Sequence, residues 1–394
     1  MGKWLKQTGK SLFGNVALVA LLALAISAGA GWFLWWLAGT PDMHAWDKPG
    51  DIIRTALTIT AGIGAVVALV VAYRRQLNLE AAEQRLDAAE TRENTKLFNE
   101  RFRSAADQLG SDRAAVRLAG IHAMAGLADD WEKGRQTCID VLCAYMKMPY
   151  DPPEPLPEDA TPEQVKGLVE ELHERQVRWT IIDTIGKRLR QEPKPGTWHD
   201  LEFDLMSSTI DGGNLSNIQV TSGILSLMDA DIYGYLNLRG THLDGGKIDF
   251  TLASVHTDGE LDFVGSTFTS GTFDAPGLKL AGGMANLSES TFKGATVEFG
   301  QSKVTDGKLL LARSSFIKGN VSVAGASIGE QGALSFSEST FSGAHVALHD
   351  IPGSTGIVDI SDSQLSGGTV DARGSERVNI SGLVVAGGNL LIGQ

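Results

Sequence analysis

Cysteine is scarce in this chain, which has only two among its 394 residues, Cys138 and Cys143. Both fall in a predicted helix, and because they are five positions apart they point to different faces of it, so no disulfide is expected between them. Two thiols also cannot form the network of disulfides on which small secreted domains depend. The scarcity excludes a disulfide-built extracellular protein and fits a reducing cytoplasm.

Basic residues are outnumbered, with 34 Lys and Arg against 47 Asp and Glu and a formal net charge of −13. Most of the excess lies in residues 201–394, which hold 21 acidic and 10 basic residues. An acidic surface repels nucleic-acid phosphates and attracts basic partners. We therefore expect an unidentified cytoplasmic protein as partner, and no nucleic acid.

Charge is absent from two long runs near the N-terminus, residues 12–38 and 55–73. As helices, both could cross the roughly 30 Å of hydrocarbon in a bilayer. Lysines precede the first run and Arg74 and Arg75 follow the second, so the positive-inside rule predicts a multi-pass protein of the inner (plasma) membrane with both termini cytoplasmic. The alternative is a signal peptide cleaved near residues 28–30, after which the second run would still anchor the remainder. The lipid bilayer is thus an expected partner.

Apolar residues recur about every twelve positions in the second half of the chain. The first series is Ile210, Val220, Ile232, Leu243, Val255, Phe268, Leu280, Phe292, Val304, Phe316, Ile328 and Phe341. A second series of apolar residues lies five positions before the first in each unit. A glycine follows each member of the first series after two to four positions. Apolar residues on one face of short strands, with glycine to supply φ > 0 at each corner, predict a solenoid.

The solenoid is expected to be a parallel, pentapeptide-like β-helix of about 12-residue units over residues 200–394. Phenylalanine is too bulky for the narrow interior of a coil made of one unit. We therefore expect two units in each coil, and roughly eight coils stacked about 4.8 Å apart.

Helical patterns fill the segment between the uncharged runs and the repeats. Four parts are predicted: a two-helix transmembrane anchor (1–75), a helical neck and helical pair (76–150), a proline-rich linker and a helix that caps the solenoid (151–199), and the β-solenoid (200–394). Thr161 is the predicted capping residue of the last helix. These helices should cover the open edge of the first coil, and the predicted fold class is membrane-anchored α+β.

Three stretches between residues 97 and 190 carry a family resemblance: LFNERFRSAADQLGSDRAAVRLAGIHAMAGLADD, RQTCIDVLCAYMKMPYDPP and ERQVRWTIIDTIGKRLR. They resemble the core of actinobacterial membrane-anchored proteins of the pentapeptide-repeat type. The resemblance implies two N-terminal spans, a helical module and a C-terminal repeat β-helix. The period of twelve departs from the family's pattern of five residues and its square coil of twenty.

Few residues are candidates for chemistry. Ser327 stands in a G-x-S-x-G sequence at residues 325–329, but it also precedes an inward apolar residue as other serines and threonines of the repeat do. His345 and His349, with Asp350 beside them, could bind a metal ion or be solvated surface residues. No P-loop, dinucleotide fingerprint or H-E-x-x-H is present, so no cofactor is expected.

Two further groups lie in the helical segment. His122 could gather with Cys138 and Cys143 around zinc, although buried thiols are far commoner in a helical pair. Lys187, Arg188 and Arg190 could touch anionic lipid or nucleic acid, or could simply close a helix C-terminus. No catalytic, cofactor-binding or metal-ligating residue is assigned.

The sequence therefore predicts a non-enzymatic scaffold that displays an acidic β-solenoid as an interaction surface. One alternative is a DNA mimic that occupies the DNA site of an enzyme such as a topoisomerase, and another is an enzyme with its site on the solenoid. Residues 388–392 end the last coil without a polar cap, so two solenoids are also expected to meet end to end as a homodimer.

Overall fold

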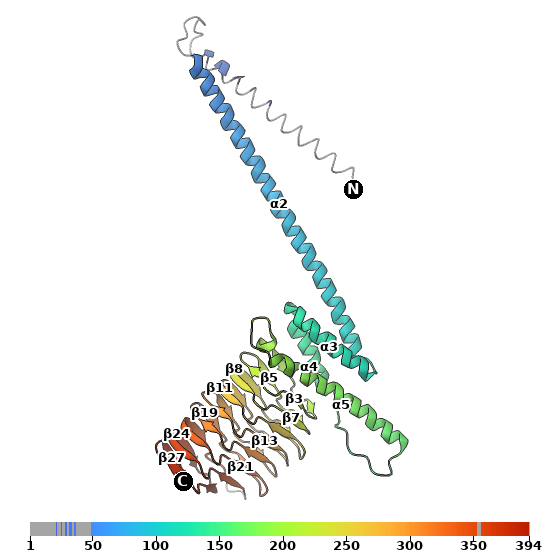
Figure 1. Cartoon of the computed structure of the whole chain (residues 1–394), viewed down its shortest axis with the longest axis vertical. Helices are drawn as coiled ribbons and strands as arrows, with labels where there is room; N and C mark the ends of the chain where they lie inside the picture. Colours follow the sequence, from blue (N-terminus) through green and yellow to red (C-terminus); the bar gives the residue numbers. More distant parts are fainter. Residues whose placement is uncertain are drawn as a thin grey trace. The chain divides into compact units, whose positions relative to one another are not determined.

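The computed structural model describes residues 49–352 and 356–393, with a few isolated positions between Leu21 and Trp36 (Figure 1). The chain divides into two compact units, Met1–Lys96 and Leu97–Gln394, each of which is described by itself. The helix α2 (Pro49–Leu109) is continuous over 61 residues, so its last turns belong to the second unit.

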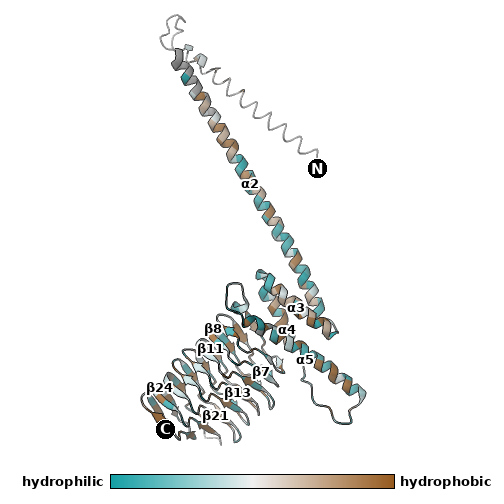
Figure 2. Ribbon diagram, in the orientation of Figure 1, coloured by the Kyte–Doolittle hydropathy of each residue, from teal (hydrophilic) through white to brown (hydrophobic). Residues whose placement is uncertain are grey.

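No helix in the described part of the chain is long and apolar enough to cross a membrane. The first predicted span, residues 12–38, falls mostly outside the described residues. The second, residues 55–73, lies in α2, where threonine and glycine are interspersed with apolar residues and the helix passes without a break into a charged stretch (Figure 2). The predictions of a membrane-anchored fold with two spans and of a multi-pass inner-membrane protein are therefore wrong on the described residues.

A small helical module follows α2. It consists of α3 (Ala114–Asp130), the 3-10 turn η1 (Glu132–Gly134), α4 (Arg135–Met146), α5 (Pro162–Leu189) and the 3-10 turn η2 (Trp198–Asp200). Thr161 caps α5 as predicted, since its hydroxyl accepts from the N–H of Gln164, whose side chain in turn accepts from the N–H of Thr161. The residue before α3 is Arg113, and it makes no side-chain cap. Apolar faces of α3, α4 and α5 pack into one core with the first coil.

The repeat segment is a parallel β-solenoid with three sheets (Figure 1). Its 13-stranded sheet contains β1 (Glu202–Asp204), β4 (Gln219–Val220), β5 (Ile224–Ser226), β8 (His242–Asp249), β11 (Thr267–Asp274), β14 (Thr291–Phe292), β15 (Thr296–Glu298), β18 (Ser315–Phe316), β19 (Asn320–Ser322), β22 (Thr340–Ala347), β24 (Gln364–Arg373), β26 (Val384–Val385) and β27 (Asn389–Gly393).

Each of the other two sheets receives one short strand from a coil. The eight-stranded sheet contains β3 (Gly213–Asn214), β7 (Tyr235–Asn237), β10 (Glu260–Asp262), β13 (Met284–Asn286), β17 (Lys308–Leu310), β21 (Ala333–Ser335), β23 (Ile357–Asp359) and β25 (Val378–Asn379). The six-stranded sheet contains β2 (Thr209–Ile210), β6 (Asp231–Ile232), β9 (Ser254–Val255), β12 (Lys279–Leu280), β16 (Lys303–Val304) and β20 (Ser327–Ile328).

The strand register gives the length of a coil. Phe268 pairs with Phe292, which in turn pairs with Phe316, so each of these two steps along the chain is 24 residues, and the step from Phe316 to Phe341 is 25. A coil therefore contains two 12-residue units, which confirms the prediction from phenylalanine size. The last step is shorter, because Thr369 pairs with Asn389, 20 residues on.

Stacked phenylalanine rings fill one side of the interior. Phe268, Phe292, Phe316 and Phe341 lie one above the other, with ring centroids 4.8–4.9 Å apart and planes within 9° of parallel. This spacing matches the separation of neighbouring strands, about 4.8 Å, so the ladder follows directly from the register. All four rings are fully buried.

A ladder of hydroxyl groups runs beside the rings. Its members are Thr241, Ser266, Ser290, Ser314, Ser339 and Ser363, all of them buried. The backbone N–H of each of the first five donates to the hydroxyl of the next at 3.0–3.1 Å. These buried polar groups are therefore satisfied within the fold, as a stable core requires.

The corner glycines have two roles rather than the one predicted. Five of them have φ between +83° and +106°: Gly212, Gly245, Gly271, Gly282 and Gly319. At others the constraint is space, since a Cβ on Gly307 would lie 2.4 Å from the backbone oxygen of Gly283 in the preceding coil. The left-handed corner itself also falls on residues with side chains, such as Glu289 and Arg313.

The helical module lies at the edge of the first coil, with α4 against β1 and α5 against β3 (Figure 1). The side-chain amide of Gln136 pairs with Glu202 as a strand would, donating to its carbonyl at 2.7 Å and accepting from its N–H at 3.1 Å. Arg190 donates to the carbonyls of Ser216 and Asn214 at 2.7 and 2.8 Å. These side chains satisfy backbone groups that a further coil would otherwise satisfy.

Candidate interaction surface

An exposed aromatic corner lies where the six-stranded and eight-stranded sheets meet in the second coil. Tyr233 and Tyr235 flank Gly234, and their side chains are 38% and 45% exposed. Only glycine fits between them, because a Cβ on Gly234 would lie 2.8 Å from the backbone of Asp211 in the coil before it. We use the name aromatic corner for Tyr233, Tyr235 and His256.

The side chains of the aromatic corner are held in place. The ring of Tyr233 stacks on that of His256, with centroids 4.1 Å apart and planes 1° from parallel. A ring nitrogen of His256 lies 2.8 Å from a carboxylate oxygen of Asp231. The hydroxyl of Tyr235 donates to Asp262 at 2.6 Å. Aromatic side chains fixed in this way lose little conformational entropy on binding, which favours their use as interface anchors.

Carboxylates set the electrostatics of the corner. Asp262 is buried, and the guanidinium of Arg239 lies 3.1 Å from it. Burial, followed by the hydrogen bond to Asp262, raises the pKa of Tyr235 to about 12, so this phenol remains a neutral donor at physiological pH. Burial and the neighbouring charges of Asp231 and then Asp151 raise the pKa of Tyr233 as well. The corner therefore combines neutral aromatic faces with negative charge.

A groove of about 490 Å³ adjoins the corner between α5 and the first two coils, and Tyr235 forms part of its lining. On its helix side, the guanidinium of Arg175 lies 4.6 Å from the centre of the Trp179 ring and 2.9 Å from Asp211. Burial raises the pKa of Asp211, against the opposing effect of Arg175. The guanidinium of Arg175 thus lies between an aromatic face and a carboxylate. The aromatic corner likewise has an exposed aromatic ring beside a carboxylate.

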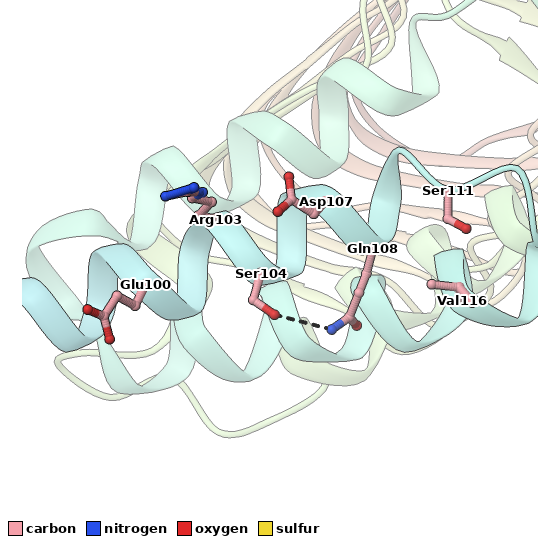
Figure 3. Close-up of a pocket in the computed structure, with 7 residues that line it drawn as sticks. All are labelled: Glu100, Arg103, Ser104, Asp107, Gln108, Ser111 and Val116. Atoms are coloured by element: carbon pink, nitrogen blue, oxygen red, sulfur yellow. Dashed lines mark hydrogen bonds between the residues drawn. The ribbon is translucent and has the colours of Figure 1, made fainter.

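A second hollow lies at the end of α2 and the start of α3 (Figure 3). All of its lining residues except Val116 are polar, and Gln108 donates to Ser104, one turn earlier in α2, at 3.4 Å. Most of the side chains that line it are exposed, including Glu100, Arg103 and Asp107. The hollow is open to solvent and brings no buried reactive group together, so the aromatic corner is the stronger candidate.

The candidate residues for catalysis and metal binding are not brought together. Ser327 begins β20, a two-residue strand followed by another turn of the solenoid, so it does not have the strand-to-helix geometry of a nucleophile elbow. His345 lies within β22, whereas His349 lies after it and contacts Asp350 at 2.9 Å. Within the described residues, no three His, Cys, Asp or Glu side chains are grouped to hold a metal ion.

The helical candidates are also separated. His122 is exposed, whereas Cys138 and Cys143 are buried and unpaired. Burial raises the pKa of the two thiols to about 11 and about 12 respectively. Lys187 pairs with Asp183 at 2.7 Å.

Arg188 and Arg190 bind residues of the helical module and of the first coil. Arg188 lies 2.9 Å from Asp129 and stacks over the ring of Trp198, 4.7 Å from its centre. Arg190 caps the first coil through Ser216 and Asn214. Arg188 and Arg190 thus have partners inside the module, which leaves less of the predicted cluster for lipid or nucleic acid.

Charge alternates along the solenoid. Residues 201–271 hold ten acidic and two basic residues, whereas residues 272–319 hold four acidic and six basic ones. Five exposed lysines surround these two coils: Lys279, Lys293, Lys303, Lys308 and Lys318. Lys279 and Lys303 are register partners on neighbouring strands. We call the five residues the lysine belt. The acidic surface is therefore concentrated in the first three coils, where the aromatic corner lies.

Sequence reasoning did not single out the aromatic corner. A signal was present, since two of the chain's five tyrosines stand in the sequence Tyr233-Gly234-Tyr235. The stacking of His256 on Tyr233 could be predicted only once the length of the second coil was known.

Comparisons with known proteins do not name a family. No protein-family model matches the chain, and no curated protein matches its sequence. The resemblance of residues 97–190 to the pentapeptide-repeat-type proteins therefore stays a prediction, while a repeat-built parallel β-solenoid is present in the structure.

Proposed function

We propose that this chain is a non-enzymatic interaction scaffold, in which the solenoid is a rigid support and the aromatic corner contacts a protein with basic side chains. The observation that carries the proposal is the pair Tyr233 and Tyr235, both exposed and both held by neighbouring side chains. Exposed, preorganised tyrosines are typical anchors of protein interfaces.

The partner's chemistry follows from what surrounds the tyrosines. The first three coils carry a strong excess of carboxylates, which would speed association with a basic surface. An arginine of the partner could lie on a tyrosine face while pairing with Asp231, much as Arg175 lies between Trp179 and Asp211.

A site-specific cross-link in cells tests this proposal. A photoreactive phenylalanine analogue in place of Tyr233 should form an adduct with a protein partner, because this ring is exposed and its hydroxyl makes no described hydrogen bond. The matched control is the same analogue at Ile317, which is 44% exposed after β18 on a different sheet. Adducts that are identical from both positions, or absent from position 233, would overturn the proposal.

The DNA-mimic alternative stays a prediction, and the lysine belt is unfavourable to it. Duplex DNA presents a negative charge every roughly 1.7 Å along its axis without interruption, whereas here two coils carry more basic than acidic residues. Inhibition of a topoisomerase by the full chain in a supercoiling assay would revive this alternative.

A further inference from the structure

The helix α5 carries apolar residues in both of its halves, but only one half is buried. The apolar residues of the second half lie in the core that the helical module shares with the first coil: Val177, Ile181, Ile182, Ile185 and Leu189. In the first half, Val165, Val169 and Leu172 are 47%, 43% and 43% exposed. No residue of α5 before Val177 is buried, and these first turns extend beyond the first coil (Figure 1).

The two apolar sets lie on different faces of the helix. Val165, Leu168, Val169 and Leu172 follow the i, i+3, i+4, i+7 spacing of one helix face. The next apolar residue, Val177, comes five positions after Leu172, and five residues turn the apolar face by roughly 140° around the helix. A helix that served only the core would keep its apolar residues on one face throughout. The first four residues, which we call the α5 stripe, therefore belong to a different contact.

The segment that carries the α5 stripe is held as a helix without help from the core. Pro162 stands in its first turn, and Thr161 and Gln164 form the capping box. Lys166 lies 3.8 Å from Glu170, one turn further on. Short helical segments are marginally stable in water on their own, so these local signals keep the stripe ordered. An ordered stripe loses less conformational entropy when a partner binds.

Charge around the α5 stripe selects the kind of partner. Residues 151–174 hold eight acidic residues and one basic residue, Lys166. Amphipathic helices that lie on membranes are rich in Lys and Arg on the polar face, whereas the polar face here carries Glu163, Glu170 and Glu171. Two copies of this acidic segment would also repel each other. The stripe therefore fits a protein that combines an apolar surface with positive charge.

We propose that the α5 stripe is a helical ligand that docks into an apolar groove, rimmed by basic side chains, on another protein. Its four apolar side chains supply the i, i+3, i+4, i+7 anchors of helix-in-groove recognition. The glutamates around them attract the basic rim and speed association. The α5 stripe is a surface other than the aromatic corner, and the inference does not rest on the proposed function.

Photo-cross-linking of the full chain, in the cells that produce it, tests the inference. A photoreactive phenylalanine analogue at position 169 should form an adduct with another protein. The matched control is the same analogue at Glu170, which is exposed on the opposite side of the helix and should give no adduct. Leu172→Gln should abolish the adduct from position 169, because it removes an apolar anchor. The double variant Glu170→Lys, Glu171→Lys should reduce its yield, because it reverses the charge beside the stripe.

These variants should unfold at the same urea concentration as the wild type, since this part of α5 is not buried, so a lost adduct reports on binding. An absent adduct at position 169, equal adducts from positions 169 and 170, or an adduct with a second copy or within the same chain would each overturn the inference. An adduct that survives Leu172→Gln or the charge reversal unchanged would also overturn it.

Vesicle binding separates a protein partner from a lipid surface. The full chain and its Leu172→Gln variant are sedimented with vesicles of phosphatidylcholine, and with vesicles that also contain phosphatidylserine. The two chains should sediment with each kind of vesicle to the same extent, because the acidic segment around the stripe does not favour a bilayer. A loss of vesicle binding in the variant would show that the α5 stripe contacts lipid, and would overturn the inference.

Discussion

The two ends of the solenoid present the same kind of strand edge, but only the first is covered by the described chain. At the first coil, Gln136 replaces a strand by pairing with both backbone groups of Glu202, and Arg190 binds two carbonyls. At the last coil, Val384 and Val385 remain half-exposed. The helical module is thus a cap, and stability should decrease from the capped end towards the uncapped one.

The largest expected effect is a difference in free energy of unfolding between a substitution in the interior and one at the uncapped end. Phe316→Ala removes a ring stacked between Phe292 and Phe341, and should cost about 4 kcal/mol in free energy of unfolding. Val385→Ala should cost about 0.5 kcal/mol in the monomer, because half of that side chain is already in water. Urea unfolding at low protein concentration measures both. Equal costs would show that the last coil is as well packed as the interior.

The cap itself can be weakened next. Arg190→Ala removes two charged hydrogen bonds to edge carbonyls and should cost about 2 kcal/mol. The control is Arg313→Ala, which breaks an exposed pair with Glu289 and should cost less than about 1 kcal/mol. Hydrogen exchange should also rise at the first coil only in the Arg190 variant. Unchanged exchange there would mean that the module does not act as a cap.

The sequence specified the solenoid well because its signal repeats. Each coil presents the same inward pattern, so the size of phenylalanine sufficed to predict two units in a coil. A finer signal confirms this, since phenylalanine alternates with aliphatic residues from Val255 to Phe341. A serine stands two positions before each of Phe268, Phe292, Phe316 and Phe341, and these four serines belong to the hydroxyl ladder.

The membrane spans and the aromatic corner were harder to predict, for different reasons. An uncharged run resembles a span in sequence, but residues 55–73 form part of a long helix that also contains charged turns. The aromatic corner depends on contacts between coils, such as that of Tyr233 with His256. Spacing along one coil does not reveal which side chains lie above one another in the next.

The two buried thiols report on the capped end. Cys138 and Cys143 lie in α4, and burial raises their pKa values to about 11 and about 12, so both should stay protonated and unreactive with iodoacetamide at pH 8. Cysteine introduced at Val384, in the uncapped end, should react at the rate of a free thiol under conditions that keep the chain monomeric. Rapid alkylation of the native thiols would indicate that the module opens readily, contrary to a rigid cap.

The smallest expected effect concerns acid stability near the uncapped end. Arg373 donates to Asp371 at 2.7 and 2.9 Å and, as the main cause, lowers the pKa of Asp371 to about 2. A carboxyl whose pKa is lowered by folding stabilises the folded state above its unfolded value of about 3.9, and this contribution is lost as the pH falls through the folded value. Asp371→Asn should therefore flatten the loss of stability between about pH 4 and pH 2. If the variant loses stability between about pH 4 and pH 2 as the wild type does, the Asp371–Arg373 pair does not make the stability of the last full coil depend on pH. The uncapped end would then be held by packing alone.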